Sequence, residues 1–188
     1  MATAYEPQLM TAEQFLALPD DGKERWLIRG ELREHGMTVR NELHSMVMAA
    51  IAAALIQWRK QLSAPRGDVV CGEAGVRLGG HPETVVGVDV AFLPPKAAAS
   101  VKSTTLIHRI PILAVEILSP SDTYEAIGEK RDLYLAAGVK LVWIIDPAAQ
   151  TITIFEINQP PRLVNRTQEL TAEPHLPGFR VAVHELFE

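Results

Sequence analysis

Two carboxylates each stand alone in an apolar stretch of the chain. Asp89 is the only charged residue in segment 85–93, and Glu116 is the only one in segment 112–118. A buried, ionised carboxylate is costly unless a cation or strong hydrogen-bond donors compensate its charge. A shared divalent cation such as Mg²⁺ would compensate both, because two carboxylates, a main-chain carbonyl and water suffice to hold it. Alternatively, each carboxylate points outward at a strand end or pairs with a nearby Arg or Lys.

Lys130 is the cation best placed to act with these carboxylates. It falls in the helix expected after the Glu116 strand, so its side chain can fold back over the end of that strand. Its ammonium group could orient an attacking water and stabilise charge on a phosphate oxygen. The competing interpretation is a solvated helix lysine next to Arg131, which the spacing alone favours.

Glu73 and His44 are secondary candidates. Glu73 lies in the strand expected to form a hairpin with the Asp89 strand, so it could be a ligand, a neighbour of the ligands or a surface residue. His44 faces the protein, where a hydrogen-bonded core histidine is more common than a ligand. The helix stripe that contains it comprises Leu43, Val47, Ile51 and Leu55.

Several other chemistries are disfavoured. The one cysteine, Cys71, cannot form an internal disulfide, and the six histidines show no zinc-ligand spacing. There is no Gly-x-Ser-x-Gly elbow and no Gly-rich phosphate loop. The longest uncharged apolar run, 46–56, is too short for a membrane span, and the N-terminus lacks the order of a signal peptide. We therefore expect a cytoplasmic protein without a membrane partner.

The elements that must position these residues can be read from periodicity and turn signals. Apolar residues recur at three- and four-residue steps across 40–62, which predicts a long amphipathic helix. The continuous apolar runs 110–118 and 140–145 predict buried strands, and the segment 123–137 between them predicts a crossover helix. The other expected elements are a capped helix after 11, hairpins of 25–28 with 31–34 and of 68–78 with 84–93, and strands at 151–157, 162–164 and 179–183.

This order predicts an α/β protein of the α+β type, with a mixed central sheet flanked by helices. The length of 188 residues suits one domain over 1–188, with residues 1–38 as an N-terminal helix and hairpin appendage. Segment 94–109 shows no clear period and predicts a mobile loop, with at most one helical turn.

The chain resembles the Uma-two family of endonucleases, formerly a domain of unknown function. The resemblance runs in order along nearly the whole chain. It is carried by the stretches 10–16, 116–122, 130–139, 142–147, 177–179 and 186–187.

The family is similar to the PD-(D/E)XK restriction-endonuclease-like nucleases, which place a metal-binding Asp and Glu on adjacent strands and a Lys nearby. The resemblance implies a catalytic set of Asp89, Glu116 and Lys130, with Mg²⁺ (or Mn²⁺) held by Asp89, Glu116 and the Ile117 carbonyl. Val88 replaces the usual Pro, and Leu118 replaces the usual Lys, so the lysine must come from the helix.

The leading hypothesis is a Mg²⁺-dependent endonuclease that hydrolyses phosphodiester bonds of nucleic acid with metal-activated water, and DNA is the expected substrate. The resemblance also implies a homodimer and supports His44 and Glu73 as neighbours of the site. One alternative is a catalytically silent nuclease fold that binds nucleic acid or protein in a mobile-element or defence system. A weaker one is a hydrolase of another phosphoester.

The charge distribution bears on the nucleic-acid partner. The chain has 23 acidic and 18 basic residues and a formal charge of −5, which argues against broad nonspecific binding. Segments 43–67 and 90–115 contain no acidic residue, however, and could contact phosphates. The basic candidates within them are Arg59, Lys60, Lys96, Lys102 and Arg109.

Overall fold

The computed structural model describes residues 9–35, 41–96 and 103–188. Its helices are α1 (Ala12–Leu16), α2 (Glu42–Gln61), α3 (Tyr124–Ala136) and a closing 3₁₀ helix, η1 (Val183–Leu186). Its strands are β1 (Glu24–Ile28), β2 (Glu31–His35), β3 (Asp68–Gly79), β4 (Thr84–Leu93), β5 (Leu113–Ile117), β6 (Leu141–Asp146), β7 (Thr151–Glu156), β8 (Arg162–Asn165), β9 (Glu169–Thr171) and β10 (Arg180–Ala182).

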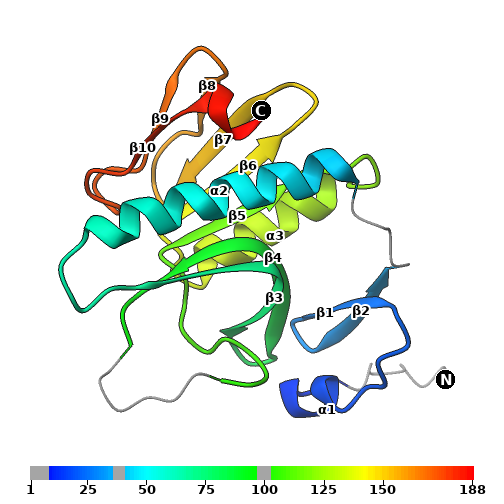
Figure 1. The fold of residues 1–188 in the computed structure, drawn as a ribbon. Helices are drawn as coiled ribbons and strands as arrows, with labels where there is room; N and C mark the ends of the chain where they lie inside the picture. Colours follow the sequence, from blue (N-terminus) through cyan, green and yellow to red (C-terminus); the bar gives the residue numbers. More distant parts are fainter. Residues whose placement is uncertain (1–8, 36–40, 97–102) are drawn as a thin grey trace, which may run out of the picture.

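The two long helices cover opposite faces of the main sheet (Figure 1). The predicted helix over 40–62 is confirmed as α2, which begins after the N-cap Asn41. Its buried side packs against alternate residues of β4, β5 and β6. The other face of the sheet packs against α3, which starts after the N-cap Thr123. None of the helices in the described residues is long and apolar enough to cross a membrane.

The main sheet has eight strands, seven of them in the order β2-β1-β4-β5-β6-β7-β8, with β3 paired to β4. β5 and β6 run parallel, joined through α3, and the other pairs are antiparallel. The sheet is therefore mixed, as predicted. β9 and β10 form a separate small sheet near the C-terminus.

Strand β4 has one edge that two strands share. β3 pairs with β4 from end to end, so it occupies one edge throughout. On the opposite edge, β5 pairs with residues 90–92 and β1 pairs only at Val85. The segment 86–89 between these two partners therefore has no strand in register beside it on that edge.

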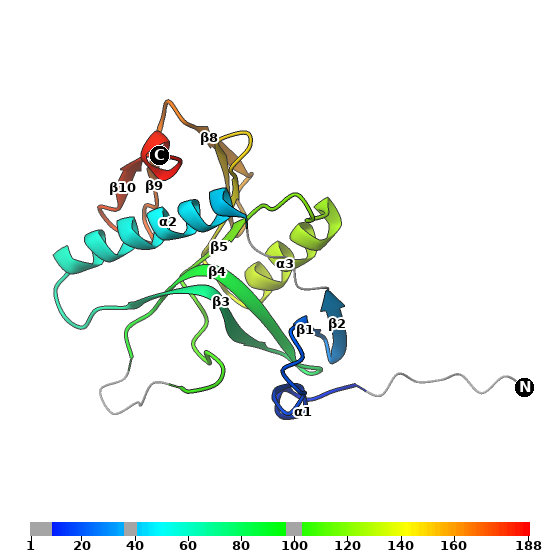
Figure 2. The same cartoon turned by 45° about the vertical axis from the view of Figure 1, so that its right-hand side comes forward.

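The N-terminal hairpin lies at one end of the molecule together with α1, away from the C-terminal strands (Figures 1 and 2). The sequence predicted this part as an appendage, but Leu27 of β1 pairs with Val85, so the hairpin extends the central sheet. Backbone bonds from Gly30 N to Glu83 O (2.8 Å) and from Met10 N to Gly30 O (2.8 Å) join it to the rest of the chain.

The remaining predictions differ from the structure at a few places. β5 is shorter than the predicted strand 110–118, and β9 was not expected. Within the segment predicted as a loop, residues 97–102 lie outside the described residues. The prediction was wrong at Ile107, which forms a parallel bridge with Val76. Its N–H donates to Gly75 O (2.8 Å), and its carbonyl accepts from Arg77 N (2.9 Å).

Candidate active site

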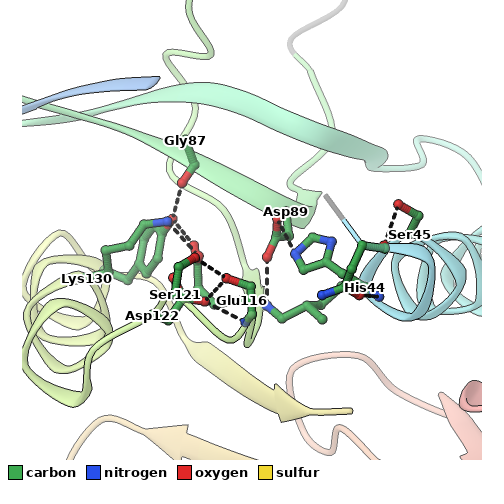
Figure 3. A network of polar contacts seen from close by, with 12 residues as sticks. His44, Ser45, Gly87, Asp89, Glu116, Ser121, Asp122 and Lys130 are labelled. Atoms are coloured by element: carbon green, nitrogen blue, oxygen red, sulfur yellow. Dashed lines mark hydrogen bonds and ion pairs between the residues drawn. The ribbon is translucent and has the colours of Figure 1, made fainter. Parts of the chain in front are cut away.

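The carboxylates Asp89 and Glu116 meet where β5 leaves the edge of β4. Val90 and Val115 are the last residues that the two strands pair at this end; Asp89 directly precedes Val90, and Glu116 directly follows Val115. Both acidic side chains are buried, at 2% and 3% exposure. The alternative in which each carboxylate points outward from a strand end is therefore wrong. The structure instead brings the two acids together where segment 86–89 of β4 has a strand partner on only one edge (Figure 3).

Glu116 points to the α3 side of the sheet and accepts a hydrogen bond on each oxygen. Lys130 Nζ donates to Oε2 at 2.6 Å, and the Tyr134 hydroxyl donates to Oε1 at 2.6 Å. Burial raises the pKa of Glu116 to about 7, while the charge of Lys130 acts in the opposite direction and that of Asp89 adds to the rise. The two donors thus offset part of the cost of burying this carboxylate.

Lys130 and Tyr134 reach Glu116 together because they lie one helical turn apart on α3. Both side chains are buried, so the solvated-lysine interpretation of Lys130 is wrong. Burial raises the pKa of Tyr134 well above its ordinary value, so the phenol remains a proton donor. Its oxygen also lies 3.1 Å from the carbonyl oxygen of Gly87, in the segment of β4 that pairs only with β3.

Asp89 is held from the opposite side of the site. The backbone N–H of Ile117 donates to its Oδ2 at 2.7 Å, which fixes the carboxylate against the end of β5. Its Oδ1 is buried with no hydrogen-bond partner among the described residues, and His44 Nε2 lies 3.4 Å from it. His44 comes from the first turn of α2, where its backbone N–H donates to the Oδ1 of the N-cap Asn41 at 2.8 Å.

His44 is fully buried, and neither ring nitrogen has a hydrogen-bond partner within the described part of the chain. A core histidine would ordinarily be hydrogen-bonded. Its Nε2 is directed toward Asp89 instead, and Figure 3 shows His44 and Lys130 approaching the two carboxylates from opposite sides. The structure thus brings His44 to the site.

Glu73 lies beside the site on a bulge of β3. The pairing with β4 shifts register between Cys71 and Ala74, opposite Asp89, and Glu73 has a positive φ of 55° there. Its carboxylate lies over Gly87, because a Cβ at Gly87 would come within 2.5 Å of Glu73 Oε2. Bulges of this kind commonly redirect side chains next to active sites.

The donor set fits a hard divalent cation. The candidate ligands are the unpartnered Oδ1 of Asp89, the carboxylate of Glu116 and the carbonyl of Ile117, all of them oxygens. Within residues 9–35, 41–96 and 103–188, no three His, Cys, Asp or Glu side chains are arranged to hold a metal. An ion here would therefore depend on two carboxylates, one carbonyl and water.

Two of the basic residues predicted to contact phosphates are engaged elsewhere. The guanidinium groups of Arg59 and Arg109 lie 3.8 Å and 2.7 Å from the carboxylate of Asp68. Arg59 lies 15 residues along α2 from His44, or about 22 Å at 1.5 Å per residue. Lys60 adjoins it at the same end of α2, Lys96 follows β4, and Lys102 is outside the described residues. Arg59 and Arg109 are thus engaged with Asp68 and not with Asp89 or Glu116.

Tyr134 is the site residue that the sequence analysis missed. Its spacing of four residues from Lys130 was the available signal, but an aromatic residue on a helix face is more often part of the core. Leu118, at the usual position of the family lysine, packs against the apolar cluster on the α3 side of the sheet. Lys130 supplies the ammonium in its place.

Comparisons with known proteins identify the family and the fold. The sequence profile of the Uma2 family, described as "Putative restriction endonuclease", matches residues 12–184. A crystal structure described as a putative nuclease belonging to DUF820, from Anabaena variabilis ATCC 29413, superposes with a TM-score of 0.78 at 17% identity. The match covers 95% of this chain and 97% of that one, and it shows a common fold. Curated proteins gave no match. Because the profile spans nearly the whole chain, the protein belongs to the Uma2 family and has the restriction-endonuclease-like nuclease fold.

Proposed function

We propose that this protein is a Mg²⁺-dependent endonuclease that hydrolyses phosphodiester bonds of DNA. One observation carries the proposal. Two buried carboxylates, Asp89 and Glu116, lie where the pairing of the adjacent strands β4 and β5 ends, and the ammonium of Lys130 lies 2.6 Å from one of them. The family assignment supports a nuclease, and the metal and the DNA substrate are the parts that we add.

Each residue of the site has a distinct role in this proposal. Asp89, Glu116 and the Ile117 carbonyl hold the ion, which supplies Lewis acidity to a water and to a phosphate oxygen. Lys130 presents a positive charge beside Glu116, where it can orient the attacking water and stabilise the charge that develops on the phosphate. Tyr134 fixes the orientation of Glu116, and Ile117 N fixes that of Asp89.

His44 is included as a positioning group for Asp89. Its ring nitrogen lies 3.4 Å from Asp89 Oδ1 and is shielded from water, so a small movement of either side chain forms a hydrogen bond. Neighbours of this kind orient the ligand carboxylate. Glu73 contributes through the backbone at Gly87, which its carboxylate overlies.

A second candidate function is a nuclease fold that binds nucleic acid or protein without cutting. The specific observation in its favour is that both oxygens of Glu116 are occupied by donors from α3. Calorimetric titration with Mn²⁺ separates the two candidates. The endonuclease takes up Mn²⁺ stoichiometrically and loses it on Asp89→Asn substitution, whereas a silent binding module has no need of the metal.

Cleavage assays test the proposal directly. Purified protein is incubated with plasmid, linear duplex, single-stranded DNA and RNA, with Mg²⁺, with Mn²⁺ or with EDTA. We expect divalent-dependent cleavage of DNA, reduced at least about 100-fold by Asp89→Asn or Glu116→Gln. The matched control is Asp132→Asn, which alters an exposed carboxylate of α3 that pairs with Arg131 at 2.8 Å. Equal cleavage by the site variants and the control would overturn the mechanism.

The proposal extends to the assembly and location of the protein. From the family resemblance we expect a homodimer in the cytoplasm. Sedimentation equilibrium of the full chain tests the dimer, and fractionation of cells expressing it tests the location.

A further inference from the structure

The surroundings of the Lys130 ammonium contain a second contact besides Glu116. The ring of Trp26 covers Nζ, with its centroid 4.6 Å away. Lys130 is only 3% exposed, so carboxylate and ring together replace much of the hydration that an ammonium group has in water. An aromatic face within about 6 Å of a cation attracts it, and more strongly when water is excluded.

Trp26 reaches this position because of how β1 joins the sheet. Its neighbour Leu27 pairs with Val85, which directly precedes segment 86–89 of β4, and is buried in the cluster with Ala12. Successive strand residues point to opposite faces, so Trp26 is directed to the side of the sheet occupied by α3. Strand β1, which pairs with β4 beyond the site, thus also places the Trp26 ring over Lys130.

Trp26 also lines a groove between the hairpin and α3, with a volume of about 880 Å³. The groove is lined by the acidic residues Glu34, Glu125, Glu129 and Asp132 and by the basic residues Arg29 and Arg33; three of the acids are on α3, and Lys130 is not among the lining residues. Trp26 thus contacts the buried ammonium and also lines the groove, whose α3 wall carries other carboxylates that could attract the lysine. Without the ring, the flexible lysine stem could turn toward the groove and leave Glu116 unpaired.

We infer that Trp26 is a positioning residue for Lys130: its ring keeps the ammonium at Glu116 and away from the carboxylates of the groove. The inference rests on the proposed function, in which Lys130 acts at the phosphate. On this inference the N-terminal hairpin is part of the active site as well as an extension of the central sheet.

Three variants test the inference. Trp26→Leu removes the aromatic face, Trp26→Phe retains one, and Arg33→Ala is the matched control. Arg33 lies on β2 opposite Trp26 and lines the same groove, where it pairs with Glu31 at 3.0 Å. We expect kcat to fall about tenfold in Trp26→Leu with KM nearly unchanged. We expect Trp26→Phe to retain at least about half of kcat, and Arg33→Ala to match the wild type.

A second readout is independent of cleavage. The ring current of Trp26 shifts the NMR signals of the Lys130 ε-methylene protons upfield. We expect this shift to persist in Trp26→Phe and Arg33→Ala and to vanish in Trp26→Leu. Lys130 signals that do not move in Trp26→Leu overturn the inference, as does a Phe variant as slow as the Leu variant. Should Trp26→Leu fail to fold, the activities and Lys130 signals of Trp26→Phe and Arg33→Ala still test whether the ring positions Lys130. If the wild type cuts no nucleic acid, the proposed function fails, and the NMR signals still test the position of Lys130.

Discussion

The ammonium of Lys130 lies 2.6 Å from the carboxylate of Glu116, and both side chains are almost completely buried. A solvent-exposed pair of this kind contributes little to stability, but breaking a buried pair leaves a charge without compensation. The contact therefore links the folding of the protein to its proposed chemistry.

Loss of Lys130 should destabilise the fold. We expect Lys130→Met to lower the free energy of unfolding by about 3–5 kcal/mol, because Glu116 then stays buried without its cation. Replacing both partners, as Lys130→Met with Glu116→Gln, should recover much of this loss. Urea unfolding of the four proteins of this cycle measures the coupling. An additive result would show that the pair does not interact as described.

Tyr134→Phe isolates the effect of one hydroxyl. The ring remains in the core, but Glu116 Oε1 loses its 2.6 Å donor. We expect a loss of about 1–3 kcal/mol in the free energy of unfolding, together with reduced cleavage. Tyr124→Phe is the control, because Tyr124 is 87% exposed. Equal stability of the two variants would contradict a positioning role for Tyr134.

Two glycine substitutions should have opposite effects. In Gly87→Ala the added Cβ would come within 2.5 Å of Glu73 Oε2, so Glu73 must move and the protein should lose stability and activity. In Gly128→Ala the nearest atom is Arg131 Nη2 at 3.9 Å, and the site is inside α3. Alanine should stabilise that helix by up to about 1 kcal/mol. Thermal unfolding of both variants checks the contrast, and a neutral Gly87→Ala would contradict the packing of Glu73.

The N-terminal region should loosen in acid. Glu83 accepts a hydrogen bond from Ala12 N at 2.7 Å and pairs with Arg77, and these contacts lower the pKa of its carboxyl. A lowered pKa means that the folded state binds the proton less readily than the unfolded chain does. The stabilisation is thus present above the ordinary carboxyl pKa, about 4.3, and is lost as pH falls through the lower folded value. The difference in stability between wild type and Glu83→Gln should shrink over that range, and a constant difference would contradict the assignment.

The basic residues divide into structural and binding groups. Arg109 pairs with Asp68 at 2.7 Å, so Arg109→Ala should mainly lower stability. Lys60→Ala should leave stability unchanged and reduce the slope of log K for DNA against log salt by about 0.9 if Lys60 contacts one phosphate. Fluorescence anisotropy at several salt concentrations measures this slope. An unchanged slope would remove Lys60 from the nucleic-acid interface.

The sequence predicted the main elements because their signals are local. The apolar period of α2, the cap Thr11 and the lone carboxylates Asp89 and Glu116 depend only on neighbouring residues. β9 was missed because three residues are too few to show a period.

The rest depends on contacts between distant segments. Nothing near Trp26 in the sequence indicates that β1 would use the same edge of β4 as β5 does, which brings the ring to Lys130. Similarly, the partnership of Arg59 and Arg109 with Asp68 forms only in the folded chain. The absence of acidic residues from a segment of sequence therefore does not show that its arginines are free to contact phosphate.

The most direct test of the central claim is anomalous diffraction from crystals of the full chain soaked in Mn²⁺. The account predicts one peak within coordination distance of Asp89 Oδ1, a Glu116 oxygen and the Ile117 carbonyl, and no such peak in crystals of Asp89→Asn. A fully soaked crystal with no peak between the two carboxylates, or with its only peak elsewhere, would contradict it.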